Sequence, residues 1–204
     1  MNRGICPSIP EKMDVVYTWV DDTWPGYKEL LGQYGKTEHD FNPNRTRDNL
    51  QTLKFSLRSL DAFAPWVNHI YIVSMRPQVP EWLDTNHPKI SIIHHDRFIP
   101  DADLPTFNSL SLTANLHRLP INSERFLYFE DDMLLLRNTP LSDFLTQDGK
   151  LRVFPRILPT PDEKIWQERG RGPWDLAIAN SNRLLNRSFG RKNRSHNGRV
   201  PLWI

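Results

Sequence analysis

The chain has 204 residues, of which 38% are hydrophobic and 25% are charged, and this composition is that of a globular protein rather than a disordered or coiled-coil one. Lysine and arginine number 26 against 24 aspartates and glutamates, so the net charge of +2 does not favour nucleic-acid binding. A single cysteine excludes an internal disulfide framework and a cysteine-based zinc site. Neither a signal-peptide pattern nor a bilayer-length apolar stretch stands out, so we expect a cytoplasmic protein.

Strands and helices are predicted to alternate along the chain after a leader over residues 1–12. Residues 14–20 are rich in β-branched and aromatic side chains and predict a buried strand. A short helix is expected near residues 27–34, and leucines at helical spacing predict a helix over 48–64 with Asp48 as its N-cap. The later predicted elements are a strand at 69–73, a helical turn or two at 80–86, a strand at 90–94, a helix at 108–118, strands at 125–129 and 133–136, a short helix at 141–145, a return to the sheet at 151–154 and a helix at 174–186.

This order of elements predicts an α/β fold. Strands that alternate with helices along a chain form mostly parallel sheets with helices on both faces. The sequence contains no internal repeat, low-complexity segment or clear linker, so we expect one domain over residues 13–204.

An acidic cluster, Glu130 to Asp132, directly follows the strand predicted at 125–129. In open α/β sheets ligands bind beyond the carboxyl ends of the strands. Adjacent carboxylates repel one another unless a cation or an arginine pairs with them, and oxygen-rich sites suit magnesium or manganese. The alternative is a solvated acidic turn, and the spacing leaves both interpretations open.

Two further segments have residues suited to a nucleotide. The first strand ends in Trp19, Val20 and two aspartates, where a tryptophan can stack on a flat ring and a carboxylate can bind a ribose hydroxyl. The alternative, a core tryptophan beside a polar turn, is favoured by spacing alone. Arg47, Asp48 and Asn49 open the first long predicted helix, where backbone amides favour phosphate. Capping by Asp48 beside a surface arginine is an equally good interpretation.

The histidines and the basic residues near the end of the chain give weaker signals. His94 and His95 follow a predicted strand, and we expect one of them to pack inward; His117 is interpreted as structural. No acidic residue follows Asp175, so the end of the chain is strongly basic. Such local charge suits a phosphate-bearing or anionic partner, and the alternative is a solvated tail.

Taken together, the motifs resemble those of the Stealth family over most of the chain. The opening motif is DVVYTWVD at 14–21. A second block includes RDN at 47–49, SLRSL at 56–60, APWVNHIYIV at 64–73, VPEWL at 79–83, HPKI at 87–90, LPTFNS at 104–109, LHRLP at 116–120 and FLYFEDDM at 126–133, and a third begins with NRLLNRSFG at 182–190 and RKNRSH at 191–196.

The resemblance implies a hexose-1-phosphate transferase. Stealth proteins include bacterial capsular and exopolysaccharide phosphotransferases and the animal enzyme that adds GlcNAc-1-phosphate to lysosomal glycoproteins. It therefore implies a nucleotide-sugar donor, usually a UDP-sugar, a polysaccharide acceptor, a divalent metal (Mg²⁺ or Mn²⁺) and no nucleic acid. It also implies a Rossmann-like, glycosyltransferase-A-like core in a bacterial cytoplasm, with peripheral attachment to a capsule assembly at the inner face of the membrane left open.

The resemblance also assigns roles to particular residues. It places Asp131 and Asp132 at the active centre as metal ligands and His196 as a candidate general base. It assigns donor binding to Asp14, Thr18, Trp19, Val20, Asp21, Arg47, Asp48, Asn49 and Asn108.

The sequence departs from the family pattern at three places. Asp22 stands where the family often has glycine, Thr113 where many members have glutamate, and Asn197 to Arg199 replace a His-x-Pro-His continuation. The chain ends before the rest of the third block and the fourth, so we expect a domain truncated at its C-terminus. The alternatives to a sugar-phosphate transferase are an ordinary nucleotide-sugar glycosyltransferase and an inactive remnant of the family.

Overall fold

The computed structural model describes residues 12–34, 50–152, 156–158, 173–188 and 200–202, and the structural statements below concern these residues. The chain divides into two compact units, Met1–Lys150 and Leu151–Ile204, which we describe separately. The leader over residues 1–12 and the single domain over residues 13–204 stay predictions. Among the described residues, no helix has both the length and the apolar character that a bilayer span requires.

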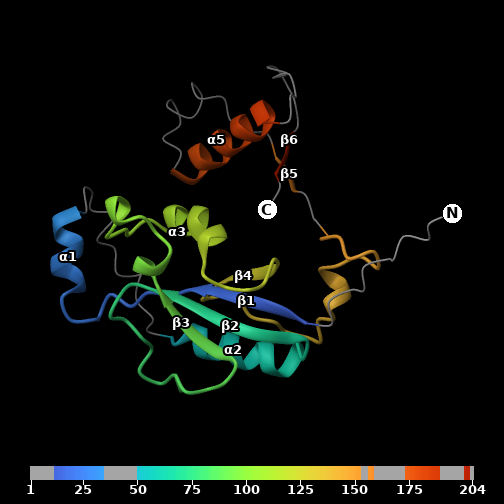
Figure 1. Cartoon of the computed structure of the whole chain (residues 1–204), viewed down its shortest axis with the longest axis horizontal. Helices are drawn as coiled ribbons and strands as arrows, with labels where there is room; N and C mark the ends of the chain where they lie inside the picture. The colour runs from blue at the N-terminus through green and yellow to red at the C-terminus, as the bar shows by residue number, and fades with distance from the viewer. Residues whose placement is uncertain (1–11, 35–49, 153–155, 159–172, 189–199, 203–204) are drawn as a thin grey trace. The chain divides into compact units, whose positions relative to one another are not determined.

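The first unit contains a sheet of four strands, all parallel (Figure 1). These strands are β1 (Met13–Thr18), β2 (Val67–Ser74), β3 (Ile90–His94) and β4 (Phe126–Glu130), in the spatial order β3-β2-β1-β4. The bounds of each strand agree with those of a predicted strand to within a few residues. The predicted α/β class, with a parallel sheet and flanking helices, is confirmed.

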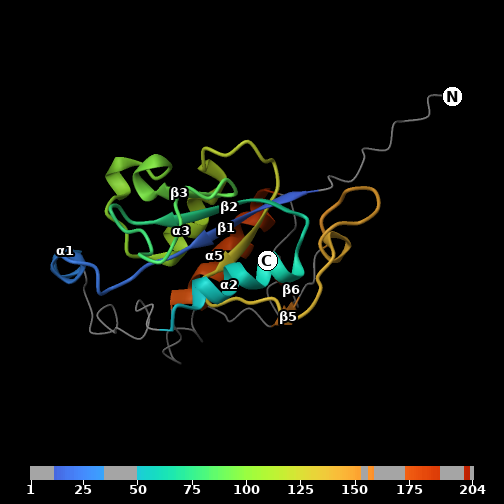
Figure 2. The same ribbon diagram turned by 90° about the horizontal axis from the view of Figure 1, so that it is seen from below.

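Apolar side chains of β1 alternate between two layers of core, and this alternation explains why both faces of the sheet are covered. Val15 and Tyr17 pack on one face with Leu53 and Leu60, which belong to the helix α2 (Thr52–Phe63). Val16 packs on the other face with Leu116 and Leu119, which lie at and just after the end of the helix α3 (Ser109–Asn115). Figures 1 and 2 show α2 and α3 on opposite faces of the sheet.

The remaining helices of the first unit are short. The predicted helix at 27–34 is found as α1 (Tyr27–Tyr34). Single 3₁₀ turns occur at His95–Arg97, Asp101–Asp103, Leu116–Arg118 and Leu141–Asp143. In the second unit, β5 (Arg156–Leu158) pairs antiparallel with β6 (Val200–Leu202), and α5 (Pro173–Ser188) matches the last predicted helix.

The predicted start of the first long helix is wrong. The helix begins at Thr52, with Gln51 in the N-cap position at a φ of 51°, which is left-handed backbone that a right-handed helix cannot run through. The N-cap position therefore belongs to Gln51, and Asp48 lies outside the described residues. Leucine spacing located the body of the helix correctly, but it contains no information about the backbone angle at Gln51.

Two other predicted elements differ from the structure. Residues 80–86, where a helical turn or two was expected, form two separate turns, closed by bonds from Leu83 N–H to the Pro80 carbonyl and from His87 N–H to the Asp84 carbonyl. Residues 133–136 are not a strand, because serine side chains of α2 bind their backbone. The Ser56 hydroxyl donates to the Met133 carbonyl. The Leu135 amide donates to Ser59 Oγ at 3.0 Å.

Candidate active site

The strand order changes direction between β1 and β4, so the carboxyl ends of these two strands flank a topological switch point. From β1 the chain continues to β2 and β3 on one side, and β4 lies on the other side (Figure 1). Open parallel sheets bind ligands in the crevice outside the strand ends at such a switch point. Thr18 pairs with Glu130 in the register. Consequently the segment that follows Thr18 and the predicted metal ligands Asp131 and Asp132 leave the sheet side by side.

A hydroxyl pair joins the two strands just below this edge. Thr18 Oγ1 lies 2.9 Å from the Tyr128 hydroxyl. Burial raises the pKa of the Tyr128 phenol, hydrogen bonds with Thr18 and Thr113 oppose that shift, and the charges of Glu130 and Asp131 add to it. The effect of Thr113 on this phenol places α3 beside the same edge, and the Thr113 hydroxyl itself donates to the Ser109 carbonyl at 2.9 Å.

The acidic cluster faces solvent at the end of β4. Glu130 and Asp132 are exposed and Asp131 is half-buried, while a turn is closed by the bond from Met133 N–H to the Glu130 carbonyl at 3.1 Å. Their oxygens are the donor type that magnesium and manganese prefer. Within the described ranges, no group of three or more histidine, cysteine, aspartate or glutamate side chains is arranged to hold a metal. The metal site stays a prediction.

Asp21 occupies the corresponding place after β1. Its Oδ1 accepts from the Thr23 amide at 2.9 Å and from the Thr23 hydroxyl at 2.8 Å, which orients the side chain. Its backbone N–H and C=O are both bonded by the side chain of Gln78 at 3.1 Å. The other carboxylate oxygen, Oδ2, forms no hydrogen bond with the described residues, so Asp21 offers an oriented acceptor near the acidic cluster.

The structure separates the other predicted donor-binding residues. Trp19 is 5% exposed and packs in the core, which is the alternative that its spacing favoured, and such a ring has no free face for stacking. Val20 follows it, half-buried, at the strand end. Asp14 lies at the opposite end of β1, buried, where it accepts from Asn68 Nδ2 at 2.9 Å and from the Ser123 hydroxyl. Asp14 therefore does not reach the edge that carries Asp21.

Asn108 is exposed and its side chain accepts from the Leu110 amide at 3.0 Å, which makes it the N-cap of α3. Arg47, Asp48, Asn49 and His196 lie outside the described residues, and their assigned roles stay predictions.

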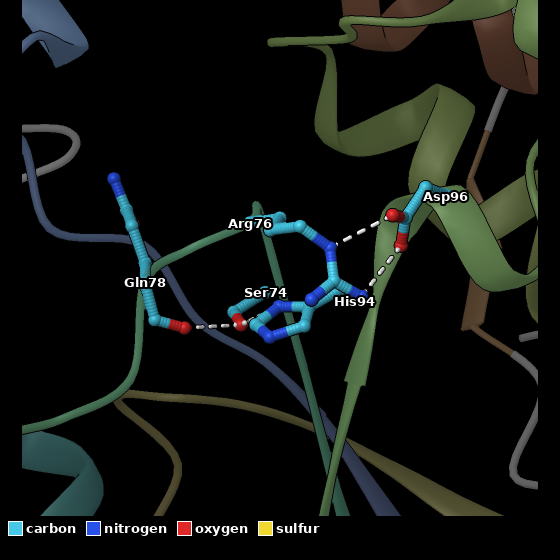
Figure 3. A network of polar contacts seen from close by, with 5 residues as sticks. All are labelled: Ser74, Arg76, Gln78, His94 and Asp96. Carbon is cyan, nitrogen blue, oxygen red and sulfur yellow. Dashed lines mark hydrogen bonds and ion pairs between the residues drawn. The ribbon is translucent and has the colours of Figure 1, made fainter.

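A polar network continues this edge over the ends of β2 and β3 (Figure 3). The Ser74 hydroxyl donates to the Gln78 carbonyl at 2.7 Å, so the His94 Nδ1 lying 3.2 Å from Ser74 Oγ is the donor to that oxygen. Burial and the Arg76 charge lower the pKa of His94. Arg76 itself is paired with Asp96 at 2.8 Å on the surface.

His95 confirms that one of the two neighbouring histidines packs inward. Its side chain is 6% exposed, and neither ring nitrogen has a hydrogen-bond partner among the described residues. Burial, assisted by the neighbouring His94 and opposed by Asp96, lowers the pKa of His95 to about 4. The imidazole is therefore neutral at physiological pH and takes up a proton only at the expense of stability.

Sequence reasoning missed Ser74, Gln78 and Tyr128. The first two are nearly inaccessible to solvent although they are polar, and they lie at or just after the end of a strand. The available signal was a glutamine in a proline-bounded segment, Pro77 to Pro80, directly after a hydrophobic strand. A polar residue held in such a short connection must find a backbone partner, but the sequence does not indicate which one.

The comparison with protein families agrees with this architecture. The family model described as "Stealth protein CR2, conserved region 2" matches residues 45–153, which is more than half of the chain. The chain belongs to the Stealth family. The matched Stealth region includes α2, the strands β2 to β4 and the acidic cluster after β4.

Curated relatives are similar to this chain over a longer stretch than the family model covers. An exopolysaccharide phosphotransferase of Streptomyces coelicolor is 38% identical over 182 residues, which are 87% of this chain and 30% of that protein. A capsular polysaccharide phosphotransferase of Haemophilus influenzae is 34% identical over 188 residues, covering 90% of this chain and 50% of that protein. Another from Neisseria meningitidis is 36% identical over 191 residues, with coverages of 88% and 50%. The chain thus spans half or less of the length of these relatives.

The buried imidazole predicts a stability loss in acid. Below the ordinary pKa of 6.5 the unfolded chain binds a proton that folded His95 does not bind until about pH 4, so stability falls across that window. The loss approaches about 3 kcal/mol, because each unit of pKa shift corresponds to about 1.4 kcal/mol. Urea unfolding at pH 7 and pH 4.5, a range that covers part of this window, should show His95→Leu losing less stability than the wild type by about 2 kcal/mol. Equal acid sensitivity in the wild type and in His95→Leu would contradict the assignment.

Proposed function

We propose that this chain carries the donor-binding and metal-binding part of a sugar-1-phosphate transferase for capsule or exopolysaccharide synthesis. The observation that carries the proposal is the position of Asp131 and Asp132, in a Stealth-family chain, directly after β4 and beside the carboxyl end of β1 at the switch point. The names of the relatives support the reaction class. The sheet would be the Rossmann-like core of a glycosyltransferase-A-like fold.

The nucleotide-sugar donor, a UDP-sugar in this proposal, would lie across the ends of β1 and β4. Asp21 supplies an oriented carboxylate oxygen suited to a ribose hydroxyl, and the backbone of Trp19 and Val20 lines the strand end beside it. Arg47, Asp48 and Asn49 would bind the donor phosphates, because guanidinium groups and amides complement phosphate oxygens. Asn108 would contact the donor from the start of α3.

Asp131 and Asp132 would hold a divalent cation, Mg²⁺ or Mn²⁺. Two adjacent carboxylates at a solvent-accessible strand end fit such an ion, which takes its other ligands from water or substrate phosphates. When bound, the ion supplies charge neutralisation on the phosphoryl oxygens.

The chemical step would be an in-line displacement at phosphorus. The oxygen of an acceptor hydroxyl forms a bond to the phosphorus that bears the donor hexose, and the bond from that phosphorus to the bridging oxygen breaks. The nucleoside monophosphate leaves with the bridging oxygen, and a sugar phosphodiester remains. His196 would take the hydroxyl proton as general base, since an imidazole titrates near neutral pH. Arginine groups would stabilise the charge on the phosphoryl oxygens.

The partners in this proposal are the nucleotide-sugar donor and a polysaccharide acceptor. The expected location is the bacterial cytoplasm, where such donors occur, at or near the inner face of the membrane that carries the capsule assembly.

Product analysis tests the reaction class directly. The protein is incubated with a UDP-sugar, Mn²⁺ and an oligosaccharide acceptor, and the released nucleotide is identified by chromatography. We expect UMP, because attack at phosphorus leaves the hexose and its phosphate on the acceptor. Release of UDP would instead show attack at the anomeric carbon by an ordinary glycosyltransferase.

Replacing the predicted metal ligand should separate metal binding from folding. Asp132→Asn is expected to abolish transfer and to weaken Mn²⁺ binding measured by electron paramagnetic resonance, because a neutral amide is a poor substitute for a carboxylate ligand. The thermal midpoint should stay within a degree or two, since Asp132 is exposed. Asp61→Asn, an exposed aspartate on α2, is the matched control and should bind Mn²⁺ normally. Normal Mn²⁺ binding and turnover in Asp132→Asn would remove the metal assignment.

The assignment of His196 as base has its own kinetic signature. His196→Ala should lower kcat by about 100-fold or more while changing donor Kd little, because general-base catalysis acts on the transition state. Stopped-flow turnover and calorimetric donor binding measure the two quantities. If both change by the same factor, His196 is a binding group.

A further inference from the structure

The backbone N–H and C=O of Asp21 lie past the end of β1, where none of the described neighbouring strands forms hydrogen bonds with them. The last bond from β1 toward β2 joins the Trp19 amide to the Val73 carbonyl at 2.9 Å. Two residues later, Asp21 is half-buried and its backbone donor and acceptor are both bonded by one side chain, that of Gln78. Gln78 Oε1 accepts from the Asp21 amide and Gln78 Nε2 donates to the Asp21 carbonyl, each at 3.1 Å.

A primary amide is the group that can form this pair of bonds, because it carries a donor and an acceptor in one plane, as a peptide group does. The Gln78 side chain thus forms the two hydrogen bonds that a neighbouring strand would form, just after the sheet ends. Removing the side chain would leave the partly buried Asp21 amide without this partner and the Asp21 carbonyl with only the longer bond from the Trp24 amide at 3.4 Å, and a buried donor is costly to leave unpaired.

Gln78 is itself held in place from both sides. Its amide donates to the Met75 carbonyl at 2.7 Å and its carbonyl accepts from the Ser74 hydroxyl, so all four of its polar groups are bonded. Figure 3 shows its carbonyl meeting Ser74 while the side chain extends in the opposite direction. Ser74 is contacted in turn by His94, so the network links the carboxyl ends of β3, β2 and β1. With 2% exposure, Gln78 has no access to a ligand and can act only through Asp21.

We propose that Gln78 is a positioning residue for the donor, which it affects by fixing the backbone of Asp21. The inference rests on the proposed function, because it takes the segment after β1 as part of the donor site. The Gln78 side chain fixes the peptide groups of Asp21 and the Thr23 bonds engage Oδ1. Together these bonds fix the direction in which the Asp21 Oδ2 atom points at the switch point.

The test compares Gln78→Glu and Gln78→Met with the wild type. Glutamate is a poor substitute at this position, because its carboxylate keeps the acceptor but opposes the Asp21 carbonyl, and methionine matches the length without either group. Gln33→Met, at an exposed position on α1, is the control. Amide hydrogen exchange should become faster at residues 19–22 in both Gln78 variants and stay unchanged in the control. Circular dichroism confirms that each protein is folded at the temperature of measurement.

Calorimetric binding of UDP-glucose and UDP-N-acetylglucosamine then shows whether this loosening matters for the donor. We expect about tenfold weaker binding in the Gln78 variants, because part of the binding free energy is then spent on ordering the Asp21 backbone. Because Gln78 acts through Asp21, Gln78→Met combined with Asp21→Asn should bind no more weakly than Asp21→Asn alone. Additive effects, or faster exchange with unchanged donor affinity, would overturn the inference. A wild type that binds neither UDP-sugar would refute the proposed donor instead, and exchange that stays slow at residues 19–22 in both variants would overturn the role of Gln78 by itself.

Discussion

The double pairing of β1 is the constraint on which the arrangement of the site depends. β1 is bonded to β2 along one edge and to β4 along the other, with Val15, Val16 and Tyr17 completely buried between the two helical layers. Its direction and register therefore cannot shift without opening both layers of core. Since all four strands are parallel, their carboxyl ends lie at one edge, and chemistry can be carried there by loops while the strands stay closely packed.

Beyond that edge, side chains replace the ladder as the source of order. The Tyr17 hydroxyl lies 2.6 Å from Ser56 Oγ, and Ser56 donates to the Met133 carbonyl, so the core of β1 is linked through α2 to the segment after the acidic cluster. Gln78 performs the same task for Asp21. In each case a buried polar side chain satisfies backbone groups that have left the sheet. This is the pattern expected where a loop has to keep one conformation without a strand beside it.

Periodicity and composition were sufficient for the sheet and its helices, because burial on two faces imposes patterns that short windows of sequence retain. The predicted strand at residues 90–94 has the same bounds as β3. Where single groups decide the structure, the same reasoning failed: the left-handed angle at Gln51 makes the first long helix begin later than expected, and two serines of α2 keep residues 133–136 out of the sheet. The DVVYTWVD motif also contains both residues that are buried for structural reasons and a residue that is accessible at the strand end. Asp14 and Trp19 are enclosed by the fold, and Asp21 is the member presented at the strand end.

The charge balance at the carboxyl edge bears on the metal. Asp21, Glu130, Asp131 and Asp132 bring negative charge to the edge where the anionic phosphates of the donor would bind. Arg76, the cation of the neighbouring network, is already paired with Asp96. Anions brought together at one strand edge repel one another unless a cation lies between them. In the proposed function, a divalent ion on Asp131 and Asp132, together with Arg47, would supply positive charge that offsets this repulsion. The overall charge of +2 conceals this local excess of acidic groups, because six of the 26 lysines and arginines lie after Asp175, where no acidic residue balances them.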